Sequence, residues 1–174
     1  MIIWINGCYG VGKTETANRL HQKMKDSHIC DPEQLGYFLW HSFPASMKRR
    51  GDFQDIEIWR EFNYKLIEYM YSHFDGHLII PMTLVNMDYY RQTAGRLKEE
   101  NKEIRHFVLT ASKGTILKRL KQRGEEKGCW AEQQIDRCLQ AFEQYIPGEK
   151  IDTNKLSPDE AADIILTKTF LPEQ

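Results

Sequence analysis

Short apolar runs alternate along this chain with longer stretches in which apolar residues recur every three to four positions. The short runs predict five strands, at residues 2–6, 27–30, 77–82, 104–109 and 149–152. The longer stretches predict helices between them, including one over 57–74 and a last one over 157–169. Runs that are apolar throughout are typical of parallel strands with both faces buried. The pattern therefore predicts an α/β fold in three αβα layers, with a five-stranded parallel sheet.

The start of the last helix is marked by local sequence signals. Ser157 suits the N-cap position, Pro158 the first helical position, and Glu160 lies three residues after the cap. In this arrangement the side chain of the cap residue accepts a hydrogen bond from the backbone N–H of the glutamate, and the glutamate side chain accepts one from the backbone N–H of the cap residue. We expect the helix to begin at this point.

Composition and charge narrow the class of protein. The chain has 174 residues, of which 41% are hydrophobic and 28% charged, so we expect a single domain over 1–174. The formal net charge is −1, and the cluster Lys48-Arg49-Arg50 is too short to predict a nucleic-acid surface. No apolar run reaches the roughly 18 residues of a membrane span, and the apolar N-terminal run is too short for a signal peptide. We expect a cytoplasmic protein without stable membrane insertion; oligomeric state is not predicted.

Cysteine and histidine spacing gives no sign of a metal centre or a disulfide framework. The four cysteines form no C-x-x-C pair, so we interpret them as reduced thiols. The six histidines show no metal-ligand spacing.

The first apolar run leads directly into a phosphate-binding motif, G-x-x-x-x-G-K-T, which extends from Gly7 to Thr14. Glycines at positions 7, 10 and 12 leave the backbone free to turn its N–H groups toward a phosphate. Lys13 is expected to contact the β- and γ-phosphates, and the Thr14 hydroxyl to ligate Mg²⁺. The helix that starts near Glu15 would direct its positive end toward the same anion. The motif predicts a P-loop NTPase fold that binds ATP with magnesium.

Cations for phosphoryl transfer are available further along the chain. Arg119 and Arg123 are four residues apart on a predicted helix, so they share one face, and Arg137 comes from the next helix. They border the polar segment 122–131, which we expect to form a short lid. An alternative interpretation is that each arginine is solvated or pairs with a nearby glutamate.

A candidate base follows the second predicted strand. Asp31 would lie at the carboxyl end of the sheet, where open α/β sheets bind ligands, and could take the proton of an acceptor hydroxyl or hold a water on magnesium. It could equally be the N-cap of a helix, since Pro32 and Glu33 follow it. The third strand ends in Pro81-Met82-Thr83, so the acidic residue usual at this position in P-loop proteins is missing.

Several segments beyond the P-loop resemble the bacterial tunicamycin resistance proteins, relatives of the small P-loop kinases. They occur in order along the chain, at residues 1–7, 31–33, 62–64, 81–83, 111–113, 117–120 and 134–138. The resemblance implies a nucleoside-monophosphate-kinase-like sheet, ATP binding, and protection against tunicamycin, a uridine-containing antibiotic. Asp152-Thr153-Asn154 resembles the loop that backs the adenine in related kinases, which makes Asn154 a candidate nucleotide contact; a polar turn describes it equally well.

The resemblance leaves the mechanism open. One hypothesis is a kinase that phosphorylates a hydroxyl of the drug, with Lys13, Asp31 and the three arginines as catalytic residues. The second is a non-catalytic protein that binds and sequesters tunicamycin in an ATP-dependent way, which the missing acidic residue favours. The third is a kinase for a metabolic nucleoside or sugar.

Overall fold

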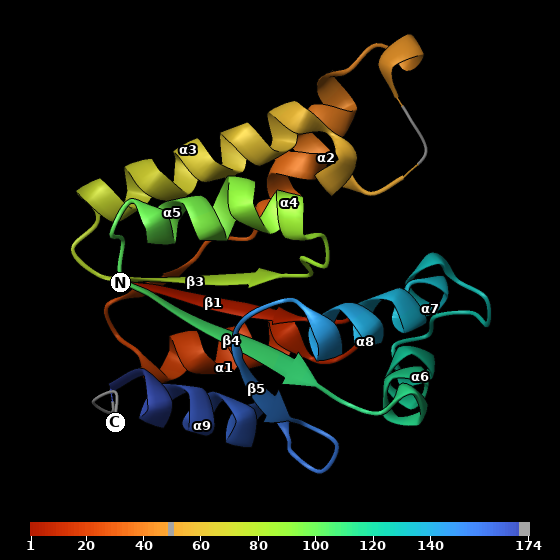
Figure 1. Ribbon diagram of the computed structural model, residues 1–174. Helices are drawn as coiled ribbons and strands as arrows, with labels where there is room; N and C mark the ends of the chain where they lie inside the picture. Colours follow the sequence, from red (N-terminus) through yellow and green to blue (C-terminus); the bar gives the residue numbers. More distant parts are fainter. Residues whose placement is uncertain (49–50, 171–174) are drawn as a thin grey trace.

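The computed structural model describes residues 1–48 and 51–170 and contains one five-stranded sheet (Figure 1). Its strands are β1 (Ile2–Gly7), β2 (Ser27–Ile29), β3 (His77–Met82), β4 (Ile104–Thr110) and β5 (Glu149–Asp152). Every neighbouring pair is parallel, and the order is β2-β3-β1-β4-β5. The predicted strands and fold class are therefore confirmed. Arg49 and Arg50 of the basic cluster lie outside the described residues.

Helices cover both faces of the sheet (Figure 1). The α-helices are α1 (Lys13–Lys23), α2 (Pro32–Ser42), α3 (Glu57–His73), α4 (Met87–Tyr90), α5 (Arg96–Glu99), α6 (Lys113–Gln122), α7 (Trp130–Gln133), α8 (Ile135–Gln144) and α9 (Pro158–Phe170). Shorter turns are the 3₁₀ helices η1 (Ala45–Met47) and η2 (Phe53–Asp55) and the π-helical turn η3 (Arg91–Gly95). None of the helices described is long and apolar enough to cross a bilayer.

Two hydrophobic cores result from the alternation of side chains along β1. Ile3 and Ile5 point into a core shared with α1, α6, α8 and α9. Ile2 and Trp4 point to the opposite face, into a core shared with α2 and α3. Successive strand residues face opposite sides of a sheet, so one apolar strand serves both layers. The P-loop therefore leaves the sheet from its best-buried strand.

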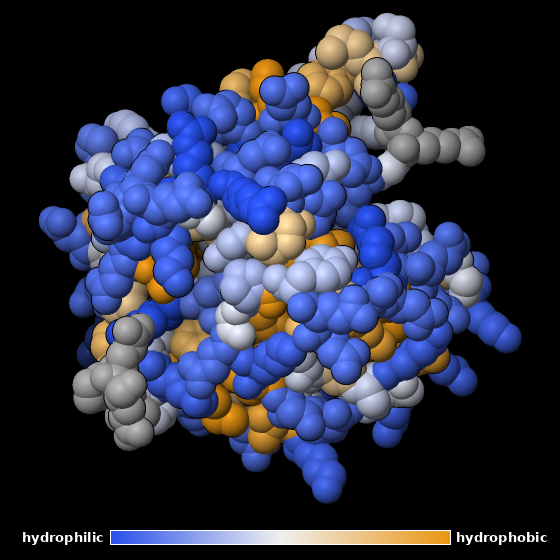
Figure 2. Space-filling model, in the orientation of Figure 1, coloured by the Kyte–Doolittle hydropathy of each residue, from blue (hydrophilic) through white to orange (hydrophobic). Residues whose placement is uncertain are grey.

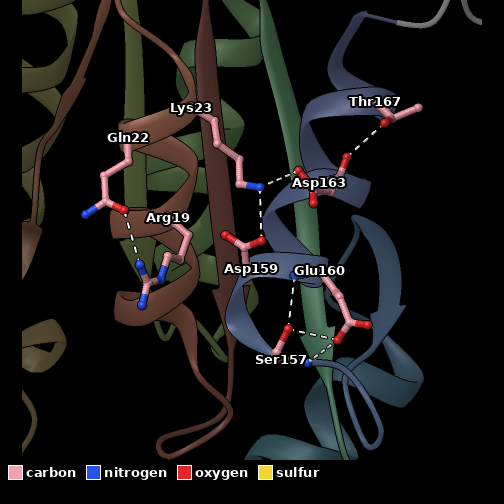
Figure 3. Close-up of polar contacts among 8 residues, drawn as sticks. All are labelled: Arg19, Gln22, Lys23, Ser157, Asp159, Glu160, Asp163 and Thr167. Carbon is pink, nitrogen blue, oxygen red and sulfur yellow. Dashed lines mark hydrogen bonds and ion pairs between the residues drawn. The ribbon is translucent and has the colours of Figure 1, made fainter.

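The last helix is fixed at its start and along its length (Figure 3). Ser157 Oγ accepts the backbone N–H of Glu160 at 3.2 Å, and a Glu160 carboxylate oxygen accepts the N–H of Ser157 at 2.8 Å. This confirms the predicted capping signal, and these bonds lower the pKa of Glu160. Lys23 of α1 bridges Asp159 at 3.2 Å and Asp163 at 2.6 Å. Helices from the two ends of the chain are thereby joined beneath the sheet.

Candidate active site

The P-loop needs glycine at its three positions for different reasons. All have positive φ, +151° at Gly7, +79° at Gly10 and +110° at Gly12. A Cβ on Gly7 would lie 2.7 Å from the Leu109 carbonyl oxygen, and one on Gly10 would lie 2.8 Å from Leu120. At Gly12 a Cβ would meet nothing within 4 Å. Two glycines thus allow the loop to pack on the protein, while the third supplies the turn into α1 and leaves the surface open.

Asn6, which sequence reasoning missed, fixes the loop's starting point. The residue is fully buried, and its Oδ1 accepts the backbone N–H of Gly7 at 2.9 Å and that of Leu84 at 2.8 Å. Its Nδ2 donates to the Leu84 carbonyl at 3.0 Å. This side chain joins the end of β1 to the segment after β3. A polar residue that ends an otherwise apolar run is the sequence signal that could have identified it.

Lys13 is buried beneath the loop. Its Nζ donates to the Cys8 carbonyl at 3.1 Å and lies 5.4 Å from the centre of the Tyr9 ring. Burial lowers the pKa of Lys13, and the negative charge of Glu33 opposes that shift. The structure thus holds a desolvated ammonium group where the motif requires a phosphate contact.

A cavity of about 570 Å³ opens on the P-loop. Its lining includes residues 9–16 of the P-loop and the first turn of α1, and Asp31 and Glu33 at the start of α2. Arg119 and Arg123 at the end of α6 and Thr153, Leu156, Ser157 and Pro158 after β5 line it too. Eight predicted site residues line it: Gly10, Gly12, Lys13, Thr14, Glu15, Asp31, Arg119 and Arg123. The cavity thus combines a phosphate cradle, cations and carboxylates, although the role of each side chain stays a prediction.

The two arginines of α6 differ in what they contact. Arg119 donates to the Val11 carbonyl at 2.9 Å, and to the Thr153 hydroxyl and carbonyl at 3.0 and 2.5 Å. It therefore joins the P-loop to the segment after β5. Arg123 is 63% exposed in its side chain and lies 3.5 Å from Glu125. Arg119 is part of the loop's support, whereas the largely exposed Arg123 pairs with Glu125, and its contact with a ligand stays a prediction.

Arg137 and Asn154 lie outside the cavity lining. Arg137 is 3.6 Å from Asp52, a residue that we did not predict as its partner. Asn154 Oδ1 accepts from the backbone N–H of Ser112 at 2.9 Å and from the Thr115 hydroxyl at 2.8 Å. It holds the start of α6 against the loop after β5, and its neighbour Thr153 faces the cavity.

Asp31 caps a helix and also lines the cavity, and its role as a base stays a prediction. Its Oδ1 accepts the Glu33 N–H at 2.9 Å and caps α2, and the residue also lines the cavity. Glu33, which sequence reasoning passed over, lines the same cavity one step further along the helix. Burial raises the pKa of Glu33, and the charge of Lys13 opposes the rise. The sequence signal that could have identified Glu33 is its position in the first turn of the helix that follows β2.

Tyr9 and Asp52 form a second unpredicted pair. The Tyr9 hydroxyl donates to Asp52 at 3.2 Å, and Gln54 Nε2 bonds both Asp52, at 3.1 Å, and the Thr83 carbonyl, at 2.7 Å. Burial is the main cause that raises the pKa of Asp52 and of Tyr9. No sequence pattern brings positions 9 and 52 together, so only the fold could reveal this link.

The expected lid spans the end of α6, a turn and the first residues of α7. Gly124 and Gly128 have φ of +83° and +81°, and the Gly128 N–H donates to Glu132 at 2.8 Å. The Trp130 ring meets the Tyr9 ring edge to face, with centroids 4.7 Å apart. The segment therefore contacts the P-loop, and its opening and closing stay a prediction.

Magnesium would depend on few protein ligands here. Among the residues described, no three His, Cys, Asp or Glu side chains cluster as a metal site. Mg²⁺ commonly takes one or two carboxylates, with phosphates and waters completing its shell. Thr14 and Asp31 both line the cavity and fit that pattern. Thr83, which follows β3, is fully buried and has no hydrogen-bond partner for its hydroxyl in the described part of the chain.

Comparison with known proteins identifies the family. A family model described as an AAA domain matches residues 3–140. The chain belongs to this AAA domain family. The tunicamycin resistance protein of Deinococcus radiodurans is 30% identical, with a TM-score of 0.82, and the match covers 98% of this chain and 96% of that one. The predicted family resemblance is therefore confirmed. A search of curated proteins found no match.

More distant structures share the fold alone. A sugar kinase from Janibacter is 15% identical with a TM-score of 0.66, over 95% of this chain and 92% of that one. A gluconokinase from Sinorhizobium meliloti is 13% identical with the same TM-score, over 96% and 90%. Membership of this P-loop family implies that the protein binds a nucleotide. The chain shares its fold with small-molecule kinases.

Proposed function

We propose that this protein is an ATP-dependent phosphotransferase that acts on a hydroxyl group of a tunicamycin-like nucleoside. The observation that carries the proposal is the cavity shared by the P-loop, two arginines at the end of α6 and two carboxylates at the start of α2. Phosphoryl transfer needs phosphate positioning, positive charge at the transferred group and a base at the acceptor. The nature of the acceptor is supported by the likeness to the D. radiodurans protein.

Each side chain has a defined part in this proposal. Lys13 holds the β- and γ-phosphates, and Arg123 with Arg119 stabilises charge on the moving group. Asp31 takes the proton as the acceptor O–H bond breaks, the new O–P bond forms and ADP leaves with the electrons of the broken P–O bond. Magnesium, held through Thr14, would neutralise phosphate charge. Arg137 would have to leave Asp52 to take part.

The test is mass spectrometry of tunicamycin after incubation with the protein and magnesium-ATP. We expect the mass of one added phosphate, absent for Lys13→Ala. Asp31→Asn should also lose turnover but keep ATP affinity, because Asn caps a helix as well as Asp does. Unmodified drug in the wild-type reaction would contradict the kinase proposal.

A sequestering protein is the second candidate, favoured by the missing carboxylate after β3, where Thr83 stands. It predicts that unmodified tunicamycin co-purifies with the protein only when ATP is present, and that Asp31→Asn protects as well as the wild type. If an ordinary nucleoside or sugar were phosphorylated faster than tunicamycin, that result would instead support a metabolic kinase.

A further inference from the structure

One face of α3 leaves apolar side chains in water. Ile58, Phe62, Leu66 and Tyr69 are each between 42% and 60% exposed. Successive helix residues are about 100° apart, so these four positions fall within about 80° of the helix surface and form one stripe, called here the α3 stripe. They are four of the eleven large hydrophobic side chains exposed in the described part of the chain, so exposed apolar surface is concentrated on this helix. Figure 2 shows tan and orange surface at the upper edge of the molecule, where Figure 1 draws α2 and α3.

The fold itself does not need the α3 stripe. Helix α3 packs on the rest of the protein through the other face, where Trp59, Tyr64 and Ile67 are buried in the core shared with α2 and the sheet. Exposed apolar side chains that occur singly need no explanation, whereas a contiguous group of them marks an interaction site. The α3 stripe is such a group.

Charges beside the α3 stripe favour a protein partner over a bilayer. The polar positions of α3 carry Glu57, Glu61 and Glu68 against Arg60 and Lys65. Helices that lie on a membrane surface are rich in Lys and Arg on their polar face. An excess of glutamate disfavours that environment, and the mixture of both signs suits a partner that also carries both.

The α3 stripe is complementary to itself. A two-fold axis that crosses α3 at right angles near residues 63–64 would place two copies of the helix antiparallel. Phe62 would then lie opposite Leu66 of the other copy, and Ile58 opposite Tyr69. Glu61 and Lys65 lie 3.6 Å apart along one edge of the stripe. The same axis brings that edge against itself in reverse order, so each carboxylate meets the other copy's ammonium group, as an isologous interface requires.

We propose that the α3 stripe is a dimer interface whose partner is a second copy of this chain. Aromatic side chains have about 150–250 Å² of surface, so the half-exposed stripe contributes roughly 300–400 Å² per copy. A standard interface covers about 800 Å² per partner, so apolar contact supplies about half of one. The dimer is therefore reversible, with a dissociation constant on the order of micromolar. This inference does not depend on the proposed function.

The test is sedimentation equilibrium of the full-length protein, over concentrations from about 1 to 300 µM that bracket the expected constant. We expect a monomer–dimer equilibrium. Leu66→Asp should raise the dissociation constant at least tenfold, because the symmetry places a charge in the apolar contact twice. Tyr145→Asp is the matched control and should change nothing: Tyr145 is also about half exposed but follows α8, in the other helical layer.

A pair of charge reversals tests the orientation of the two copies. Lys65→Glu leaves glutamate at both edge positions, and Glu61→Lys leaves lysine at both, so each variant alone should dimerise at least fivefold more weakly than the wild type. An equal mixture should form heterodimers about as tight as the wild-type dimer, because opposite charges face each other again. Glu61 also pairs with Arg96 at 3.3 Å, so the mixture, rather than Glu61→Lys alone, decides the outcome.

Three results would overturn the inference. The first is a wild-type protein that stays monomeric at every concentration, including the case in which it binds phosphatidylcholine vesicles and Leu66→Asp does not. The second is an equal loss of dimer in Leu66→Asp and Tyr145→Asp. The third is a mixture of the charge-reversed variants that associates no more tightly than each variant alone.

Discussion

The two sides of the candidate active site are built differently. The nucleotide side, residues 7–16, is set by backbone: three glycines with positive φ and a buried asparagine determine its path. The side that we propose for the acceptor, residues 31–48 and 51–56, presents side chains, among them half-buried carboxylates and exposed apolar groups. A backbone cradle fits any triphosphate, whereas side chains select one acceptor. The difference explains why nucleotide binding follows from a motif and the substrate does not.

The largest expected effect is on the nucleotide side, at Lys13. Lys13→Ala should lower ATP-dependent turnover by about a hundredfold or more, because a charge aimed at the phosphates is removed. The folded state should be as stable as before or more so, since the buried ammonium is costly and is no longer present. Steady-state kinetics and thermal unfolding measure the two quantities. Lys118→Ala, on the exposed side of α6, is the control and should change neither.

The second effect tests whether the backbone of the P-loop is as constrained as we describe. Gly7→Ala should lower the free energy of unfolding by roughly 3 kcal/mol, because the new Cβ meets the Leu109 carbonyl and φ is positive. Gly114→Ala in α6 is the matched control, since a Cβ there meets nothing within 4 Å. Urea denaturation should show a gain of about 0.5 kcal/mol for that variant. Equal results for both would contradict the packing described.

A smaller change in the free energy of unfolding, of opposite sign, is expected for Glu33 on the acceptor side. Glu33→Gln should raise the free energy of unfolding at pH 7 by about 1 kcal/mol or less, because it removes a charge that burial disfavours. Glu57→Gln is the control, because Glu57 occupies the first turn of α3 but is exposed, and it should lose a few tenths of a kcal/mol. A loss of stability in Glu33→Gln as large as that in the control would contradict the burial effect.

The pH dependence of the same variant follows from the sign of the shift. The pKa of Glu33 is raised in the folded state, so the folded form binds protons more strongly than the unfolded form. Its contribution to stability is fully present below the ordinary glutamate pKa and is lost as pH rises through the raised value. Thermal unfolding between pH 4 and 7 should therefore show a shallower fall in Glu33→Gln than in the wild type.

The smallest effect, on the KM for the acceptor, is expected at Tyr9, where the nucleotide side and the acceptor side meet. Tyr9→Phe keeps the ring beside Lys13 but removes the hydrogen bond to Asp52, which is worth about 1 kcal/mol. We expect the KM for the acceptor to rise several-fold while the KM for ATP stays unchanged. Tyr69→Phe, at an exposed position of α3, is the control. A rise in the KM for ATP instead would show that Tyr9 belongs to the nucleotide side alone.

What the sequence could predict was local. The strands, the capping of α9 and the P-loop depend on residues close together in the chain, so periodicity and motif were sufficient. The same holds for the opening of α2, where Asp31 caps a helix two residues before Glu33.

What the sequence could not predict depends on distant residues that meet in space. Asp52 reaches Tyr9 across 43 positions, and Arg137 reaches Asp52 from the far side of the lid segment. Spacing predicted that Arg119 lies near the phosphates. It could not predict that Val11 and Thr153 accept hydrogen bonds from Arg119.

The contact between Phe53 and Gly36 has a consequence for how this protein can diverge. Any side chain at position 36 would collide with the Phe53 ring, so α2 and the segment after it would move apart. Relatives that lose this glycine should therefore also carry a smaller residue at position 53. We expect the two positions to change together through evolution, and their joint replacement to accompany a change in acceptor.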